Sequence, residues 1–257
     1  MSNVNVQQQG QKLVELHASG DLIVLPTVWD AWSARLAVEA GFAALTVGSH
    51  PVANAFGMPD GEEQDFNDYL EQVQRIAEAV NVPVSADVES GYGLIPEELI
   101  GRVLEAGAVG VNIEDTVHSD DDRVRGPQEL EDYIAAAVEA ASVAGVPFVV
   151  NGRTDALVHG TAMFTDPLAE AVSRIQAMER AGALSVYPVG LPDAASVTAA
   201  VRAVSVPVNV TVDPVKGHPA GGMEELRALG VRRLSFGPLW QSELEAPATK
   251  MLQAWRS

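Results

Sequence analysis

The chain contains no cysteine. This absence excludes a disulfide framework, a thiolate metal site and a cysteine that acts as nucleophile or acid. It also fits a reducing compartment. Residues 1–9 show neither the basic start nor the apolar centre of a signal peptide. We therefore expect a cytoplasmic protein.

Basic residues are scarce, because 16 Lys and Arg stand against 35 Asp and Glu, which gives a formal charge of −19. A surface with this charge repels phosphate polymers and anionic lipid, so neither nucleic acid nor a membrane is an expected partner. Long hydrophobic runs are missing too, and no apolar stretch is long enough to cross a bilayer. Most of the acids are expected on solvated helix faces.

Aromatic residues make up only 5% of the chain, whereas 47% of it is hydrophobic and rich in Ala and Val, a composition typical of α/β proteins. From residue 22 onward, short apolar runs of strand type alternate with amphipathic helical patterns, and several helices are followed by Gly. The predicted strands span residues 22–26, 43–47, 82–86, 110–113, 148–151, 184–187, 208–210 and 233–236. The predicted helices span residues 7–19, 31–40, 66–80, 96–106, 129–144, 167–181, 194–204, 223–229 and 239–255.

Eight strand–helix units without a flexible linker predict a (β/α)8 barrel of the TIM type that occupies residues 1–257 as a single domain. A helix within residues 1–20 precedes the barrel, and a helix within residues 237–257 ends it. The competing architecture is an open, doubly wound sheet. Against it, residues 26–30 follow the first strand in place of a Gly-rich phosphate-binding turn.

Acidic side chains follow two neighbouring predicted strands at the edge where a barrel places its catalytic groups. Asp87 and Glu89 end the third strand, where alternation would put both on one face, and Glu114 follows the fourth strand. Carboxylates crowded together repel one another, and their oxygens are ligands that Mg²⁺ and Mn²⁺ prefer. These three acids therefore predict a divalent metal site. The alternative is that they cap helices or pair with basic loop residues.

Further polar groups end other strands, and each has two interpretations. Arg153 either holds a carboxylate or phosphonate in a bidentate manner or forms a salt bridge with Asp155. The turn at Gly48 and Ser49 either forms an anion pocket or is an ordinary turn. His118 either transfers a proton or lies in a solvated loop. Tyr187 and Asn209 end the sixth and seventh strands.

Several phrases resemble the isocitrate lyase/phosphoenolpyruvate mutase superfamily in order and spacing. The most specific is the Gly-Tyr-Gly that follows paired acids, with a Glu-Asp strand end after it. The matching phrases are VWDAWSARL at 28–36, EAGF at 39–42, GMPDG at 57–61, ADVESGYG at 86–93, NIED at 112–115 and RTDA at 153–156.

The resemblance implies a barrel whose eighth helix commonly packs on a neighbouring subunit, which gives homodimers or homotetramers. It implies Mg²⁺ bound by Asp87, with Glu89 and Glu114 contributing directly or through water. The enzymes of this family cleave a bond beside a 2-oxo group and leave an enolate, which a chelated metal stabilises. The resemblance assigns a 2-oxoacid carboxylate or its enolate to the residues Thr46, Gly48, Ser49 and Arg153, with Asp60 supporting that site.

The segment after the fourth strand departs from this family. Residues 115–127 contain neither the Lys-Lys-Cys-Gly-His type segment of the carbon–carbon lyases nor the Lys-Thr-Asn segment of the phosphonate enzymes. After the sixth strand, Tyr187 and Pro188 stand where the tricarboxylate lyases tend to have Glu and the mutases have His. Cleavage of isocitrate-type substrates and the mutase reaction are therefore both disfavoured.

These observations favour a Mg²⁺-dependent enzyme that acts on a small 2-oxoacid, or on a 2-hydroxyacid that yields one, by carbon–carbon cleavage. Tyr187 and Asn209 join the predicted substrate-binding residues, and His118 is the candidate mobile general acid. The alternative is phosphorus–carbon chemistry of the phosphonomutase or phosphonopyruvate hydrolase type. A third possibility, from another class, is a barrel that binds a metabolite without converting it.

Overall fold

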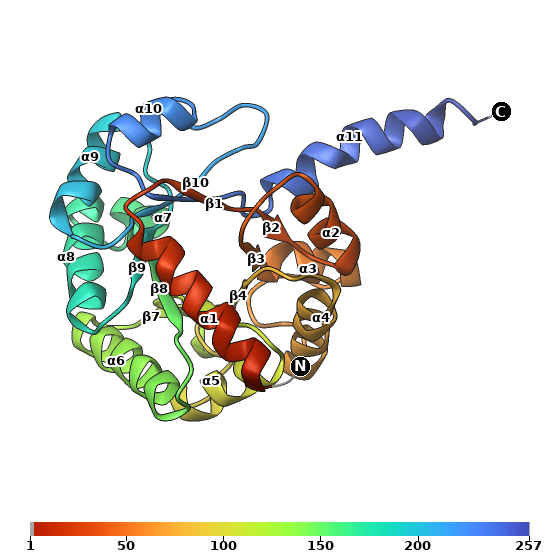
Figure 1. The fold of residues 1–257 in the computed structure, drawn as a ribbon. Coiled ribbons are helices and arrows are strands. Elements are labelled where there is room, and N and C mark those ends of the chain that lie inside the picture. The colour runs from red at the N-terminus through yellow and green to blue at the C-terminus, as the bar shows by residue number, and fades with distance from the viewer. Residues whose placement is uncertain (1–2, 257) are drawn as a thin grey trace.

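Parallel strands form a closed ring surrounded by helices in the computed structural model, which describes residues 3–256 (Figure 1). One sheet has the order β2-β3-β4-β5-β8-β9, and a second has the order β1-β11-β10. The ring strands are β1 (Ile23–Leu25), β2 (Thr27–Val28), β3 (Leu45–Val47), β4 (Val84–Asp87), β5 (Gly110–Ile113), β8 (Val149–Thr154), β9 (Ser185–Pro188), β10 (Asn209–Thr211) and β11 (Arg233–Ser235).

Two junctions join the sheets into a ring. β1 and β2 are separated only by Pro26, which has no N–H to donate to a strand ladder. On the other side, Val186 of β9 forms a parallel bridge with Val208, the residue before β10. The ring therefore has no open edge, so the predicted barrel is confirmed and the open doubly wound sheet is excluded.

The expected helices are present, with ends that differ by a few residues. They are α1 (Asn3–Ala18), α2 (Ala31–Glu39), α4 (Phe66–Ala79), α5 (Pro96–Glu105), α6 (Pro127–Val143), α8 (Pro167–Arg180), α9 (Ala194–Ala203), α10 (Met223–Ala228) and α11 (Leu239–Gln253). Within the described residues, none of these helices is both long enough and apolar enough to cross a membrane.

Three elements were not expected from the sequence. Helix α3 (Ser49–Phe56) and the short helix α7 (Ala156–His159) each begin directly after a strand end. An antiparallel hairpin of β6 (Thr116–Val117) and β7 (Arg123–Val124) follows β5. All three follow the carboxyl ends of ring strands, and α3 lines the cavity of the candidate site.

Helix α1 closes the amino-terminal end of the ring. Val6 and Leu13 of this helix pack with Leu25, Val109 and Val149, which belong to the ring strands or immediately precede one. The other end of the ring is therefore the one open to solvent.

Helix α11 extends away from the ring (Figure 1). Its first turn is anchored by an edge-to-face contact between Trp29 and Trp240, with ring centroids 5.1 Å apart. Farther along, Met251 and Leu252 are exposed, and so is Trp255 just beyond the end of the helix. Residues 1–2 and 257, which the predicted terminal segments included, lie outside the described residues.

The contact of α1 with the barrel predicts that a change from glycine to alanine has opposite effects on the free energy of unfolding at two helical positions. A Cβ atom at Gly10 would lie 2.0 Å from the carbonyl oxygen of Pro147, whereas a Cβ atom at Gly101 in α5 would meet nothing within 4 Å. Gly10→Ala should lower the free energy of unfolding by about 1–3 kcal/mol through this overlap. Gly101→Ala should raise it by about 0.5–1 kcal/mol through better helix propensity. Urea unfolding measures both, and stabilisation by both substitutions would contradict the packing of α1.

Candidate active site

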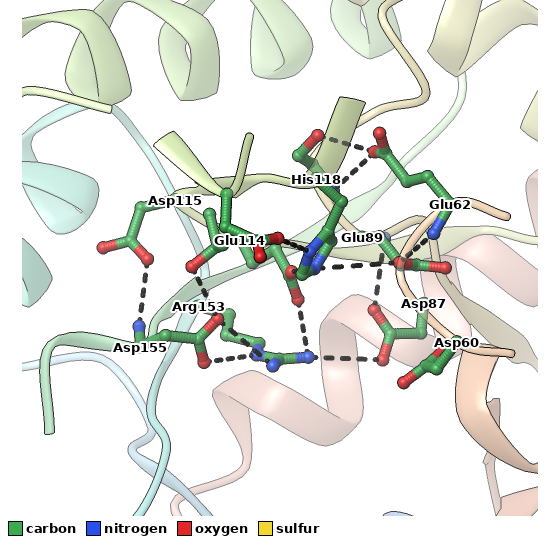
Figure 2. Close-up of polar contacts among 12 residues, drawn as sticks. Asp60, Glu62, Asp87, Glu89, Glu114, Asp115, His118, Arg153 and Asp155 are labelled. Atoms are coloured by element: carbon green, nitrogen blue, oxygen red, sulfur yellow. Dashed lines mark hydrogen bonds and ion pairs between the residues drawn. The ribbon is translucent and has the colours of Figure 1, made fainter. Parts of the chain in front are cut away.

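Charged side chains from three neighbouring strands meet at the open end of the ring (Figure 2). Asp87 is the last residue of β4, Glu114 follows β5, and Arg153 lies near the end of β8. The Arg153 NH1 atom lies 2.6 Å from Oε2 of Glu114 and 3.9 Å from Oδ2 of Asp87. Its Nε and NH2 atoms donate hydrogen bonds to the Asp155 carboxylate. The guanidinium of Arg153 therefore lies among three acids.

Glu89 reaches this cluster by a different backbone path from the one expected. Alternation along an extended strand was predicted to place it on the same face as Asp87, but β4 ends at Asp87 and Glu89 has a φ of 48°. This left-handed conformation is uncommon for a residue other than Gly. The Glu89 carboxylate accepts hydrogen bonds from the Tyr92 hydroxyl at 2.9 Å and from the Glu62 N–H at 2.7 Å. The predicted geometry was wrong, although the carboxylate still lies close to the other acids.

Glu62 is a structural residue of the site that sequence reasoning did not identify. Its Oε1 atom accepts hydrogen bonds from the backbone N–H of Ser90, the hydroxyl of Ser90 and the backbone N–H of Tyr92. These bonds fasten the loop that contains Asp60 to the turn that contains Glu89. Because the partners lie about 30 residues apart, no local sequence pattern signals the contact.

His118 lies in the 3-10 turn between β6 and β7, over the acid cluster (Figure 2). Its Nε2 atom lies 2.7 Å from Oε1 of Glu114, and its Nδ1 atom lies 2.7 Å from Oδ1 of Asp122. The hydrogen bond to Glu114 and, after it, the one to Asp122 outweigh burial and raise the pKa of His118 to about 10. The side chain is thus a protonated donor between carboxylates and not part of a freely solvated loop.

Burial makes negative charge on the acids of the cluster unfavourable. It raises the pKa of Glu89 to about 8, and the carboxylates of Asp60, Asp87 and Glu114 add to the shift. Burial also raises the pKa values of Asp87 and Glu114, against the opposing effect of the Arg153 guanidinium. These three groups hold protons more strongly than ordinary carboxyls, so a further cation would be bound favourably.

The acids fit a divalent cation in chemical type, since all three offer carboxylate oxygens. Within residues 3–256, however, no group of three or more His, Asp or Glu side chains is arranged to hold a metal ion. Arg153 and His118 stand between the acids and supply the positive charge there. The predicted ligands Asp87, Glu89 and Glu114 thus come together, but in an arrangement that these two cations dominate.

A cavity of about 320 Å³ opens beside the cluster. Most of the predicted substrate residues line it: Thr46, Gly48, Ser49, Asp60, Arg153 and Tyr187. Asn209 does not line the cavity, because it is buried below it and its amide donates to the hydroxyl of Ser235 at 3.0 Å. Asn112 lines the cavity without having been predicted, and its Oδ1 atom accepts a hydrogen bond from the Asn151 amide at 2.8 Å.

The expected turn at Gly48 and Ser49 is the start of helix α3, with Gly48 as the N-cap residue. A Cβ atom at Gly48 would lie 2.6 Å from Cγ2 of Thr27 and 2.8 Å from Cγ of Pro51, so only glycine fits. The first N–H groups of a helix lack intrahelical partners and attract anions. This helix start therefore supplies backbone donors at the cavity wall.

A buried ion pair holds the cluster from outside the cavity. Asp115 accepts a hydrogen bond from the N–H of Asp155 through Oδ1, and its Oδ2 atom lies 3.0 Å from NH1 of Arg174. Arg125 donates to the carbonyl oxygens of Glu114 and Ser90. These bonds fix the backbone that presents Glu114 and Asp155, so Asp115 acts on the cluster by positioning it.

The sequence and fold of this chain are similar to those of known enzymes. A family model described as phosphoenolpyruvate phosphomutase matches residues 13–255. The 2-methylisocitrate lyase of Escherichia coli (strain K12) is 29% identical over 208 residues, which cover 77% of this chain and 68% of that protein. The oxaloacetate decarboxylase of Paraburkholderia xenovorans (strain LB400) is 31% identical over 207 residues, which cover 78% of this chain and 67% of that protein.

A solved structure of phosphonopyruvate hydrolase with oxalate and Mg²⁺ has the same fold, with a TM-score of 0.83 and 25% sequence identity. The match covers 96% of this chain and 86% of that one. Proteins named as a lyase, a decarboxylase and a phosphonopyruvate hydrolase thus resemble this chain to a similar degree.

The raised pKa of Glu89 predicts how stability depends on pH in the absence of metal. Between about pH 5 and pH 8 the folded protein retains a proton that the unfolded chain has released, so stability falls as the pH rises through this range. Glu89→Gln should make this fall shallower by up to about 1.4 kcal/mol per pH unit. Urea unfolding in the presence of a chelator at several pH values measures the slope.

The exposed Glu63, which lies beside Glu62 on the loop between α3 and α4, provides the control. Glu63→Gln should leave the pH slope at its wild-type value, because this side chain is exposed and lies outside the buried acid cluster. A Glu89→Gln protein with the wild-type slope would show that Glu89 does not hold the proton.

Proposed function

Since the chain belongs to the phosphoenolpyruvate phosphomutase family, we propose that it is a Mg²⁺-dependent lyase that cleaves a carbon–carbon bond in a small 2-oxoacid, or in a 2-hydroxyacid that yields one, through an enolate. The observation that supports this most is the meeting of Asp87, Glu114 and Arg153 beside an open cavity. Enolate formation needs positive charge close to the keto and carboxylate oxygens, and these residues either carry that charge or attract it.

Asp87, Glu89 and Glu114 would hold the divalent cation. When bound, the cation would draw electron density from the oxygens on which negative charge develops. Of these ligands only Asp87 lines the cavity, so it is the one that faces both the cation and the substrate. Glu89 and Glu114 lie behind it and are buried.

The chain itself would bind the acid end of the substrate at two places. Arg153 offers its guanidinium from the β8 side of the cavity. Across from it, Ser49 offers its hydroxyl and the free backbone N–H groups at the start of α3. Binding between fixed donors orients the substrate before the bond breaks, which lowers the barrier.

His118 would act as a proton donor and not as a base. Its pKa of about 10 keeps the ring protonated at neutral pH. It lies on the β6–β7 hairpin, which also covers Glu114 and limits the access of water to the acids. Opening and closing of this hairpin would admit the substrate and then shield the enolate from bulk solvent.

We further propose that α11 docks on a second copy of the chain. Leu252 near the end of α11 and Trp255 just beyond that end are exposed on a segment that extends away from its own barrel. An apolar surface of this kind is usually covered by another protein chain. Light scattering should give the mass of two or more chains. Leu252→Asp should lower that mass to one chain, whereas Val143→Asp on α6 should not. A wild-type protein with the mass of one chain would contradict the docking.

Removal of the central carboxylate tests the proposed metal site. Oxalate is a planar mimic of the enolate, so wild-type protein should bind it in a Mg²⁺-dependent manner, as measured by isothermal titration calorimetry. Asp87→Ala should weaken this binding on the order of 100-fold, because it removes a ligand of the cation. Asp132→Ala, which removes an exposed acid on α6, should leave the binding unchanged.

Two results would contradict the proposed function. Mg²⁺-dependent oxalate binding by Asp87→Ala that equals wild-type binding would refute the metal site. Incubation with phosphonopyruvate, followed by phosphorus NMR, distinguishes the type of bond cleaved. The lyase proposal predicts an unchanged phosphorus signal, and a shifted signal would favour the phosphonate alternative.

A further inference from the structure

The two sides of the active-site cavity differ in charge. Asp87 on β4 and Arg153 on β8 line one side. In the order of the ring, β10, β11 and β2 stand opposite these strands, and they contribute Thr211, Ser235 and Thr27 to the lining. The charged groups thus gather at one end of the cavity, and the opposite wall is neutral.

Among the described residues, no unpaired cationic side chain lines the cavity. In the described part of the chain, Arg153 is the only arginine or lysine that lines it, and it is already paired with Glu114 and Asp155. His50 also lines the cavity, but its Nδ1 atom lies 3.2 Å from Oδ2 of Asp60. An anionic group bound far from the acid cluster would therefore meet no unpaired cationic side chain among the described residues.

The nearby loop between β10 and α10 does not supply one. Its Lys216 pairs with both Asp213 and Glu243. A substrate with a second negative charge would have to place that charge against neutral groups, in the field of the buried acids at the other end. The cost of an unpaired charge in such a site is large.

The neutral wall is nevertheless able to form hydrogen bonds. The Thr27 hydroxyl accepts a hydrogen bond from the N–H of Phe236 at 3.1 Å, and the Ser235 hydroxyl accepts one from the Asn209 amide at 3.0 Å. Within the described residues these bonds occupy lone pairs and leave each hydroxyl proton to be donated. Val189 and Leu239 add apolar surface beside them. Such a wall suits an uncharged group that carries an oxygen acceptor.

We propose that the substrate is a monoanionic 2-oxoacid whose far end is uncharged and bears a hydroxyl or carbonyl oxygen. This inference rests on the proposed 2-oxoacid function and specifies its substrate. The single carboxylate binds at the charged end, and the neutral tail lies along Thr27, Ser235 and Leu239. Dicarboxylates and phosphonates are disfavoured, because their second anionic group has no partner.

A neutral tail also determines which fragment leaves. In a 4-hydroxy-2-oxoacid, breaking the C3–C4 bond leaves its electron pair on C3 as an enolate. C4 becomes the carbonyl carbon of an aldehyde or ketone as its hydroxyl gives up a proton. A proton then adds to C3, which yields the shorter 2-oxoacid. One proton is lost and one is gained, so no oxidant or second reactant is needed.

A matched pair of unreactive ligands tests the tail. 2-Oxopentanoate and 2-oxoglutarate have the same carbon chain, but the first ends in a methyl group and the second in a carboxylate. Each is titrated against the oxalate complex of the wild-type protein in the presence of Mg²⁺. 2-Oxopentanoate should displace oxalate at a concentration at least about tenfold lower than 2-oxoglutarate. Equal or tighter binding of 2-oxoglutarate would overturn the proposal and leave the lyase function intact.

A charge added to the neutral wall should reverse the preference. Leu239→Lys keeps an alkyl stem and brings an ammonium group into the cavity. It should improve 2-oxoglutarate binding by about tenfold or more relative to 2-oxopentanoate. Val143→Lys adds the same charge to a distant exposed position and should change neither. An unaltered ratio in Leu239→Lys would show that the tail does not reach this wall. Failure of oxalate itself to bind would instead refute the underlying function.

Discussion

A guanidinium held among buried carboxylates is the interaction on which this site depends. Arg153 contacts Glu114 and Asp155 directly and lies within 3.9 Å of Asp87. Without that cation, three acids would share one water-poor corner of the ring at a high electrostatic cost. Two cations offset the negative charge of these acids: the Arg153 guanidinium and the His118 ring, which lies on the β6–β7 hairpin. The raised pKa of Glu89 indicates that the two cations do not fully offset the acids, and this is why we propose that a divalent cation binds there.

The barrel provides this arrangement because its strands all deliver their carboxyl ends to one side. Helix α1 closes the opposite end with apolar side chains, so polar groups collect where α1 does not reach. The buried pair of Asp115 and Arg174 then fixes the backbone between Glu114 and Asp155. The acids are thus positioned by groups that never touch the cavity.

Much of the ring could be predicted from the sequence, because strand and helix periodicities are local and several helices are followed by a glycine. The resemblance to the isocitrate lyase/phosphoenolpyruvate mutase superfamily, stated from short phrases, is confirmed by the family match. Contacts between distant segments could not be predicted in this way. Glu62 binds the turn at Ser90 and Tyr92 across about 30 residues, and the Nε2 atom of His118 lies 3.9 Å from Oε2 of Glu89 on a different loop. Asn209 was assigned to the substrate because it ends a strand, yet its side chain points below the cavity and supports Ser235.

We propose that Asp87, Glu89 and Glu114 share one divalent cation when Arg153 and His118 no longer satisfy them. A crystal structure with Mn²⁺ and oxalate tests it most directly, because the anomalous signal of manganese locates the ion independently of the protein atoms. We expect one peak bound by the Asp87 carboxylate, with Glu89 and Glu114 turned toward it directly or through water and with oxalate between the ion and Arg153. An absent peak, or a peak elsewhere with the three acids still closed on Arg153 and His118, would contradict it.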